Sequence, residues 1–170
     1  YASQIRILAG SEVSIMADGS LDYAKKHLDL LDWVVASVHS RFKQSREEMT
    51  KRIITAIGNR HVNAIGHPSG RLIGAREPYD VDVDKVLSAA RASNVALEIN
   101  SSPQRLDLKD SHIRAAVEKG VKLVINSDAH HENQLRFVEF GIAQARRGWA
   151  GSKDVINTLP WKQFEKYLSK

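Results

Sequence analysis

The sequence predicts an α/β fold built on a parallel β-sheet, and two observations lead to this prediction. Five short runs rich in Val, Ile and Leu are apolar on both faces, which is typical of buried parallel strands. Amphipathic helical patterns separate these runs, as in successive βαβ units. We expect strands over residues 5–13, 33–38, 62–65, 95–99 and 121–125.

Start and stop signals frame the helical patterns. Ser45 is a candidate N-cap with Glu48 three residues later, the spacing of a capping box. Gly120 and Gly148 follow two of the patterns, at positions where a helix is expected to end. The expected helices cover residues 45–57, 82–92, 110–119, 134–147 and 160–168.

Length and composition restrict the class of protein. A chain of 170 residues has the size of one globular domain, which we expect to span residues 1–170. No apolar run approaches the ~20 residues of a membrane helix, so we predict a soluble, cytoplasmic protein. The chain has no cysteine and a formal net charge of +5. Any metal site must therefore use His, Asp and Glu, and the charge mildly favours anionic partners.

Metal-ligand residue types follow the expected strands. The carboxyl ends of parallel strands share one edge of the sheet, which is where (β/α) barrels build their active sites. Candidate groups recur there about every thirty residues, roughly one βαβ unit, and this coincidence predicts a metal centre of oxygen and imidazole ligands. His27, His61 and His112 lie elsewhere and are expected to be structural. The candidates are Glu12, His39, His67, Glu98 or Asn100, and Asp128 with His130.

Basic residues gather in the loops after the same strands. Arg41 and Lys43 follow His39, and Arg105 follows Asn100. Arginine side chains match the geometry of phosphate groups. A phosphate-bearing substrate is therefore expected.

Several motifs together resemble one known family. They are GSEV, VASVHS, IGHPSGRLIG, LEINSSPQRLDL, KLVINSDAH and FGIAQARRGW. They are similar to the PHP (polymerase and histidinol phosphatase) domain at the C-terminal end of bacterial family X DNA polymerases, over nearly the whole chain. The resemblance implies a distorted (β/α)7 TIM-like barrel that holds up to three Mn²⁺ or Zn²⁺ ions.

The resemblance also implies roles for individual residues. Glu12 would bridge two ions, His39 and His67 would complete one site with it, and Asp128 and His130 would serve a second and a third site. These five residues are the predicted metal and catalytic groups. The predicted substrate contacts are Arg71, Arg105, Lys43 and Asn100.

One departure from the family pattern concerns the N-terminal side. PHP domains open with an H-x-H strand and further histidines that this sequence lacks, and five strands are fewer than seven. We therefore expect an N-terminally truncated PHP domain without roughly the first two βα units. Only the Glu12, His39 and His67 set would be complete, so the other two sites would be weak or empty. Exposed sheet edges of such a fragment favour self-association.

The implied reaction is metal-dependent hydrolysis of DNA phosphodiesters during repair. It would act as a 3′-5′ exonuclease, with abasic-site endonuclease and 3′-phosphatase activities as further options. DNA and the polymerase (nucleotidyltransferase) core of the same chain would be the partners. One alternative is a phosphatase for a small phosphomonoester such as histidinol phosphate. Another is a catalytically incomplete module that holds DNA or acts as a scaffold.

Overall fold

A five-stranded, all-parallel sheet with strand order β1-β2-β3-β4-β5 forms the centre of the protein. The computed structural model describes residues 5–168. The strands are β1 (Gly10–Ser14), β2 (Trp33–Ser37), β3 (Ala64–Ile65), β4 (Ala96–Asn100) and β5 (Leu123–Asn126). The α-helices are α1 (Lys25–Leu28), α2 (Arg46–Ile57), α3 (Val83–Ser93), α4 (Asp110–Lys119), α5 (Val138–Arg147) and α6 (Trp161–Leu168), with 3₁₀ turns η1 (Glu132–Phe137), η2 (Ser152–Asp154) and η3 (Ile156–Thr158).

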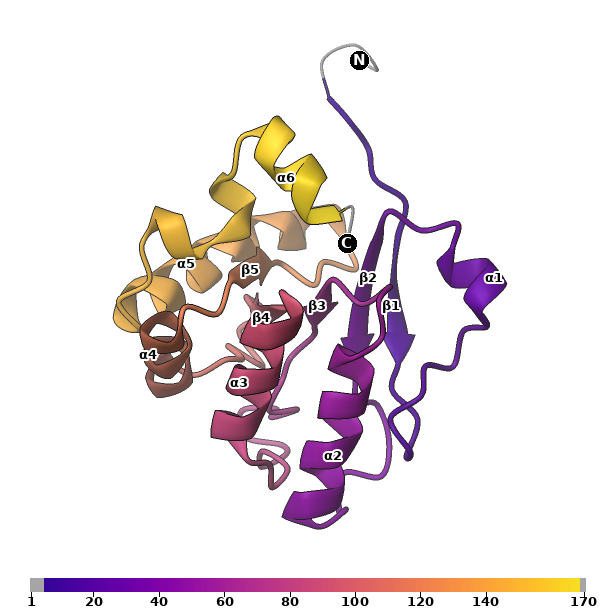
Figure 1. The fold of residues 1–170 in the computed structure, drawn as a ribbon. Helices are drawn as coiled ribbons and strands as arrows, with labels where there is room; N and C mark the ends of the chain where they lie inside the picture. Colours follow the sequence, from indigo (N-terminus) through magenta and orange to yellow (C-terminus); the bar gives the residue numbers. More distant parts are fainter. Residues whose placement is uncertain (1–4, 169–170) are drawn as a thin grey trace.

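The strand order determines where the helices lie. Each strand pairs with the next strand in the chain, and parallel crossovers are almost always right-handed. Successive crossovers of one hand place their helices on one face of the sheet. Helices α2, α3 and α4 accordingly follow one another along that face (Figure 1). This arrangement confirms the predicted α/β class and is that of a partial TIM-like barrel.

The helix-covered face carries the main hydrophobic core. Alternate strand residues such as Val13, Ile65 and Leu97 are almost fully buried against the helices. From the helices, Met49 and Ile113 enter the same cluster and are also fully buried. Burial of such aliphatic side chains contributes about 1.5–3 kcal/mol each, so this layer is the main source of stability.

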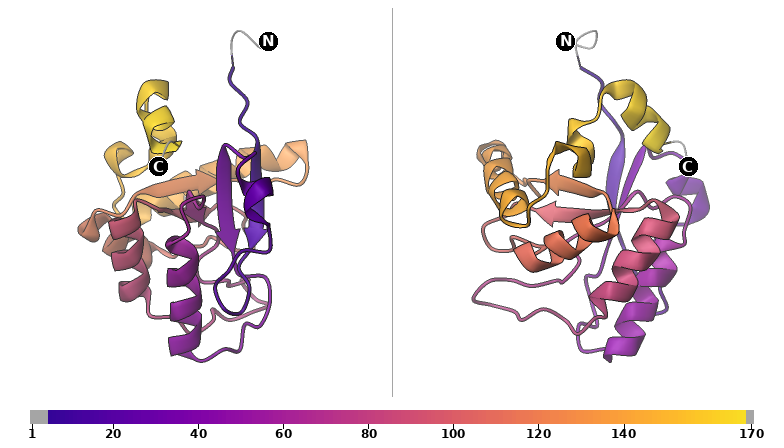
Figure 2. Two further views of the ribbon diagram at one scale, coloured as in Figure 1. Left: turned by 45° about the vertical axis from the view of Figure 1, so that its right-hand side comes forward. Right: turned by 60° about the vertical axis from the view of Figure 1, so that its left-hand side comes forward.

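The other face of the sheet divides into two halves along the strands. Its amino-terminal half is apolar, where Ala64, Ala96 and Val124 pack with Phe164 and Tyr167 of α6. Figure 2 shows α6 on the side of the sheet opposite α2 and α3. Its carboxyl-terminal half is polar and carries the side chains of Glu12, Ser14, Ser37, Glu98, Asn100 and Asn126. The polar half is therefore the part of this face that α6 leaves for ligands.

The predicted helix ends agree closely with the structure. Ser45 Oγ accepts the backbone N–H of Glu48, whose carboxylate in turn accepts the Ser45 N–H, which completes the capping box. Helix α4 ends at Gly120 in the left-handed conformation, with φ of 70°, and α3 ends in the same way at Asn94. Local sequence signals thus set the boundaries of these helices.

Two predicted boundaries were wrong by several residues. The strand expected over residues 5–13 begins only at Gly10, because pairing with β2 starts at Gly10 and Trp33. Ile5 and Ile7 before it are 65% and 86% exposed, so their apolar character does not report a buried strand. The helix expected over residues 134–147 opens as the 3₁₀ turn η1 and becomes α-helical at Val138.

Side chains cover part of both outer strands. Asp22 Oδ1 accepts the backbone N–H of Ser14 at the edge of β1. On β5, Asn157 accepts the N–H of Ile125 through Oδ1 at 2.8 Å and donates Nδ2 to its carbonyl at 2.9 Å. Such coverage reduces the tendency of open edges to pair. Self-association stays a prediction.

Among residues 5–168, no helix combines the length and the apolar character that crossing a bilayer requires.

We predict that Gly66→Ala destabilises the sheet where β2 meets the loop after β3. A Cβ at Gly66 would lie 2.3 Å from Ser37 Oγ and 2.8 Å from Val35 Cγ1, closer than real Cβ contacts allow. Overpacking of this kind costs about 1–3 kcal/mol, which urea unfolding followed by circular dichroism would measure. Gly58→Ala is the matched control, because a Cβ there meets no atom closer than 3.4 Å. Equal stability of the two variants would contradict the prediction.

Candidate metal centre

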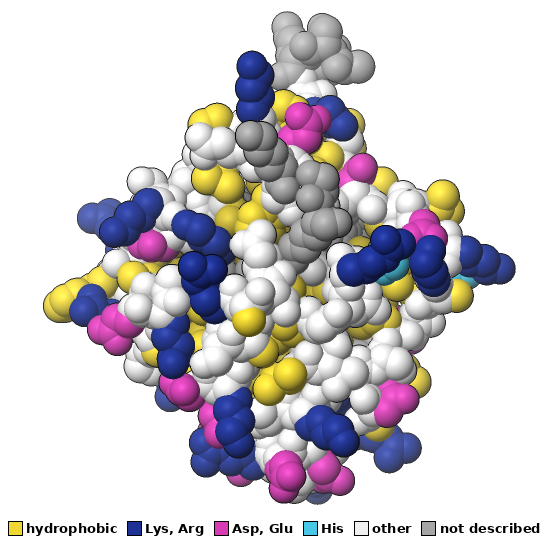
Figure 3. Space-filling model, viewed as in Figure 1, with side chains coloured by type: hydrophobic (Ala, Val, Ile, Leu, Met, Phe, Trp, Pro, Cys, Tyr) yellow, Lys and Arg dark blue, Asp and Glu magenta, His cyan; other side chains and the backbone are white. Residues whose placement is uncertain are grey.

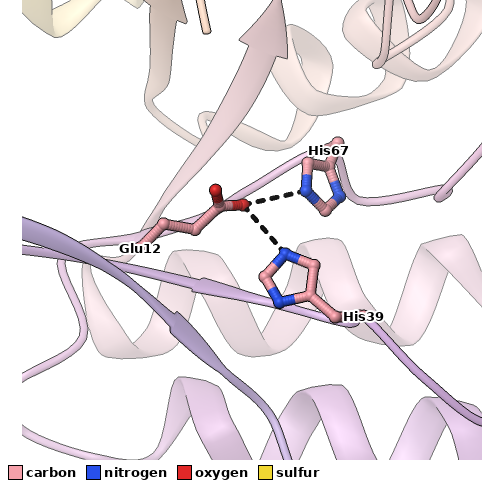
Figure 4. A group of neighbouring side chains, drawn as sticks. All are labelled: Glu12, His39 and His67. Atoms are coloured by element: carbon pink, nitrogen blue, oxygen red, sulfur yellow. Dashed lines mark hydrogen bonds and ion pairs between the residues drawn. The ribbon is translucent and has the colours of Figure 1, made fainter. Parts of the chain in front are cut away.

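Three side chains from neighbouring strand ends converge on the polar half of the sheet. Glu12 lies on β1, His39 follows β2 and His67 follows β3. Glu12 Oε1 is 3.2 Å from His39 Nε2 and 2.9 Å from His67 Nε2. Figure 4 shows both imidazoles directed at the same carboxylate oxygen. The structure therefore brings together the three residues that the sequence predicts as one complete ligand set.

The arrangement fits a divalent cation. One donor atom from each residue lies within 4.8 Å of the others. Tetrahedral Zn²⁺ with ligands at 2.0–2.2 Å keeps its donor atoms roughly 3.3–3.6 Å apart, only slightly wider than the two hydrogen-bond distances. A carboxylate with two imidazoles suits zinc, manganese or iron. Small shifts of Glu12 would open the space for an ion.

A contact with Ser14 supports the ring orientation of His39. Ser14 Oγ lies 3.0 Å from His39 Nδ1, so the Nδ1–H donates to the hydroxyl when Nε2 carries the lone pair. Metal-binding histidines commonly hold their second nitrogen in this way. Ser14 thus supports the ring orientation in which Nε2 faces Glu12.

The pKa shifts at the centre favour an ionised Glu12 next to a protonated His67. The hydrogen bonds from His39 and then His67 hold the pKa of the Glu12 carboxyl far below its usual value, against the effect of burial. For His67, burial alone would lower the pKa, yet the hydrogen bond with Glu12 and nearby acidic groups leave it raised. The ligand carboxylate is therefore ionised throughout the physiological range, and protons compete for His67.

A buried carboxylate, Glu98, fixes the backbone at His67. Its Oε2 accepts the His67 N–H at 2.6 Å and the Asn100 side-chain N–H at 3.2 Å, while its Oε1 accepts from Asn126 at 2.7 Å. Burial raises the pKa of Glu98, although these hydrogen bonds oppose the rise. Position 67 has φ of 26°, an unusual conformation for a residue with a Cβ. The Glu98 hydrogen bond helps to hold it.

A second buried carboxylate supports the same loop. Asp107 is completely inaccessible, and its Oδ2 accepts the backbone N–H groups of Ser69 and Gly70 at 2.9 and 3.0 Å. Burial raises the pKa of this carboxyl as well. Two acidic side chains from distant segments thus hold the loop that presents His67.

Asp128 and His130 lie beside the three-residue cluster rather than in it. Asp128 Oδ2 accepts from Asn100 at 3.0 Å and lies 3.5 Å from Arg105 Nε. The His130 side chain is 82% exposed, and its Nδ1 donates to the Asp128 carbonyl at 2.9 Å. Both residues leave the end of β5, so they share the edge of the sheet with the cluster. Their roles as ligands stay predictions.

The predicted substrate contacts have different surroundings. Arg71 donates Nε to the Arg105 carbonyl at 2.7 Å and another N–H to the Leu106 carbonyl, which binds two loops together. Asn100 bridges Glu98 and Asp128. Lys43 is exposed in the loop after β2. Arg105 is the arginine of this group that lines a pocket beside Asp128.

The supporting roles of Ser14 and Asp107 were not predicted. Ser14 lies two residues after Glu12 on the same strand, so its position on the polar face follows from strand alternation. Its contact with His39 depends on the register between β1 and β2. Asp107 lies within the LEINSSPQRLDL motif, but nothing in that pattern indicates that its carboxylate accepts hydrogen bonds from the loop at Ser69.

Comparison with known proteins supports the resemblance predicted from the motifs. No family model matches the chain. Over 165 residues, 97% of the chain, it is 46% identical to the DNA polymerase/3′-5′ exonuclease PolX of Bacillus subtilis. Nearly the whole chain is therefore similar to one part of a PolX DNA polymerase/3′-5′ exonuclease, in agreement with the resemblance that the motifs indicate. The chain is 38% identical to a probable phosphatase of Thermoanaerobacter sp. over 136 residues, which are 74% of the chain. It is 28% identical to a probable phosphatase of Aliivibrio fischeri over 178 residues, which cover 99% of the chain.

The chain matches only part of each relative. It spans 29% of the length of the Bacillus PolX, 53% of the Thermoanaerobacter phosphatase and 69% of the Aliivibrio phosphatase. The Glu12, His39 and His67 cluster, together with these phosphatase-type relatives, indicates use of a divalent metal ion.

We predict that replacing a cluster ligand weakens metal binding. His39→Asn removes one of three donors, and we expect the affinity for Zn²⁺ to fall at least about tenfold, measured by isothermal titration calorimetry. Because the pKa of His67 is raised, the wild-type affinity should increase with pH through and above the usual imidazole range of about 6.5. His27→Asn, at an exposed site on α1, is the control. Equal affinities for all three proteins would refute the ligand set.

We also predict that Asp107→Ala damages the loop that carries His67. The change leaves the N–H groups of Ser69 and Gly70 without their acceptor, which costs about 1–3 kcal/mol, and it should reduce metal affinity because His67 is no longer held. Urea unfolding and calorimetry would measure the two effects. Asp107→Asn retains an acceptor oxygen and should recover part of both.

The control for this variant is Asp84→Ala, which removes an exposed ion pair with Lys119 and should change stability by less than about 1 kcal/mol. Metal affinity of Asp107→Ala equal to wild type would mean that the loop does not depend on this carboxylate.

Proposed function

We propose that this chain is the metal-dependent phosphodiesterase part of a family X DNA polymerase and removes nucleotides from DNA 3′ ends during repair. The observation that supports this most is the Glu12, His39 and His67 cluster in a chain 46% identical to a protein named as a 3′-5′ exonuclease. The polymerase core would be its partner within the full protein. Mn²⁺ or Zn²⁺ would be the resident ion, with up to three ions in the complete domain.

The residues at this edge of the sheet would have different roles in the reaction. Glu12, His39 and His67 would hold the ion, and Asp128 and His130 would supply further ligands at the neighbouring strand end. Ser14 orients His39. Bound at the cluster, the ion would supply Lewis acidity that activates water and neutralises charge on the phosphoryl group.

Positioning of the substrate would fall to the loops at the same edge. Arg105 lies beside Asp128 and its guanidinium can approach a phosphate oxygen. No side-chain nucleophile is needed for hydrolysis by activated water, which agrees with the absence of cysteine. The residues thus favour direct hydrolysis of a phosphoester.

Charge is a weak guide to the substrate. The net charge of +5 favours anionic partners, but Lys and Arg side chains are spread over the face in Figure 3 with Asp and Glu between them. The DNA proposal therefore rests on the cluster and on the PolX relative. It does not rest on a broad basic surface.

A second candidate is hydrolysis of a small phosphomonoester. The relatives named as probable phosphatases, one of them 38% identical over 136 residues, favour it. The same metal cluster would serve either reaction. Substrate choice would then depend on the loops around the cluster.

We predict that His39→Asn abolishes exonuclease activity in the full-length polymerase while the fold is preserved. Loss of one ligand should lower the rate at least about 100-fold, measured by removal of nucleotides from a 3′-labelled oligonucleotide in Mn²⁺. Circular dichroism checks folding, and His27→Asn serves as the control.

The competing substrate is tested in parallel with p-nitrophenyl phosphate. Hydrolysis of this ester without cleavage of the oligonucleotide would favour the phosphatase. Undiminished nuclease activity of His39→Asn would overturn the metal-dependent mechanism. Hydrolysis of neither compound by the full-length wild type would favour a module that only holds DNA.

A further inference from the structure

A pocket of about 400 Å³ opens beside the candidate metal centre. It is formed by the loop after β3, the turn after β4 and the segment after β5, which contribute Leu72, Arg105 and Phe137 respectively. Its volume lies within the range of small-molecule sites, about 300–1,000 Å³. Crevices outside the carboxyl ends of parallel strands are the usual binding places in α/β folds. The pocket is therefore placed to receive part of a substrate.

A continuous chain of hydrogen bonds joins the pocket to the metal centre. The His67 N–H donates to Glu98, and Asn100 donates to both Glu98 and Asp128. Asp128 lines the pocket. Two side chains, Glu98 and Asn100, thus connect the backbone of His67 to Asp128 in the pocket wall.

The pocket offers apolar surface that a phosphate does not need. Leu72 and Phe137 line it and are each half-buried. The Phe137 ring is held against Phe140, with ring centroids 5.9 Å apart. Aromatic rings stack on nucleobases with little regard to sequence, because every base has a π-face. The Phe137 ring, which is already positioned beside the candidate metal centre, is therefore suited to stack on a nucleobase.

The polar part of the lining can form hydrogen bonds with the edge of a base. Gln134 uses Oε1 to accept the His130 N–H at 2.7 Å, which leaves its amide N–H₂ to donate. Asp128, the acidic residue of the lining, lies 3.5 Å from the Arg105 guanidinium. The pocket therefore combines balanced charge, hydrogen-bonding groups and apolar walls.

We propose that this pocket binds the 3′-terminal nucleobase of a DNA strand, with the base against the Phe137 ring. This inference rests on the proposed action at DNA 3′ ends and adds the element that positions the terminal nucleotide. Phe137 is a positioning residue in this scheme. The phosphodiester next to that base would then extend toward the Glu12, His39 and His67 cluster.

The test measures binding without catalysis. Two 5′-fluorescein oligonucleotides of one sequence, one with a normal 3′ terminus and one with a 3′-terminal abasic residue, are titrated with the purified full-length protein in EDTA. Fluorescence anisotropy gives both dissociation constants. Wild type should bind the normal end roughly tenfold more tightly, the expected effect of one stacked base.

Phe137→Leu keeps an apolar side chain and removes the ring, so it should bind the two ends with nearly equal affinity. Trp149→Leu is the control, because Trp149 is an exposed aromatic residue outside the pocket lining, and it should retain the preference. Placing the abasic residue in the middle of the oligonucleotide should give no dependence on Phe137. Circular dichroism confirms that the variants are folded.

The outcomes separate this inference from the proposed function. Equal binding of both ends by wild type, or an unchanged preference in Phe137→Leu, overturns the pocket assignment even if the metal-loaded protein cleaves DNA. A preference that depends on Phe137 upholds it even if no cleavage occurs. The protein could also prefer p-nitrophenyl phosphate to the oligonucleotide and bind the two DNA ends equally. This result assigns the pocket to a small ester and also overturns the inference.

Discussion

The unequal division of one face of the sheet governs both stability and chemistry. Because each strand pairs in parallel with the next one, the crossover helices lie on the opposite face. Strand side chains that point away from these helices therefore need other packing or hydrogen-bond partners. At the amino-terminal half these residues are apolar and α6 covers them. At the carboxyl-terminal half they are polar, and the cluster around Glu12 occupies this part. A change of residue type within one strand therefore marks the border between core and site.

Two buried carboxylates explain how the site keeps its shape. Glu98 and Asp107 accept backbone N–H groups from the loop at His67. Burying an acidic group costs free energy unless hydrogen bonds compensate, and here the backbone supplies them. The loop thereby gains a rigid base although it contains no regular secondary structure. Such support is what holds a metal-binding histidine in a fixed position.

Sequence patterns were most informative where the structure depends on local or periodic features. The capping box at Ser45 and the left-handed end at Gly120 could be predicted because their partners lie within a few residues. The cluster could be predicted because parallel strands share an edge. The role of Asp107 could not, since its contact with Ser69 joins residues 38 positions apart.

The position of α6 was also beyond prediction, because an amphipathic pattern identifies a helix without identifying the face of the sheet that it covers. Ile5 and Ile7 show the opposite error, as their apolar character suggested a buried strand although both side chains are exposed. Long-range packing decided both cases.

The Asn157 side chain at β5 has a consequence for how the sheet can grow. It occupies the N–H and the carbonyl of Ile125, the groups that an added strand would use. A strand docking at this position would exchange existing hydrogen bonds for new ones, with little net gain. The backbone groups of Ile125 are already hydrogen-bonded, so a strand added at β5 would have to displace the Asn157 amide. Extension of the sheet there therefore depends on this competition and on side-chain packing.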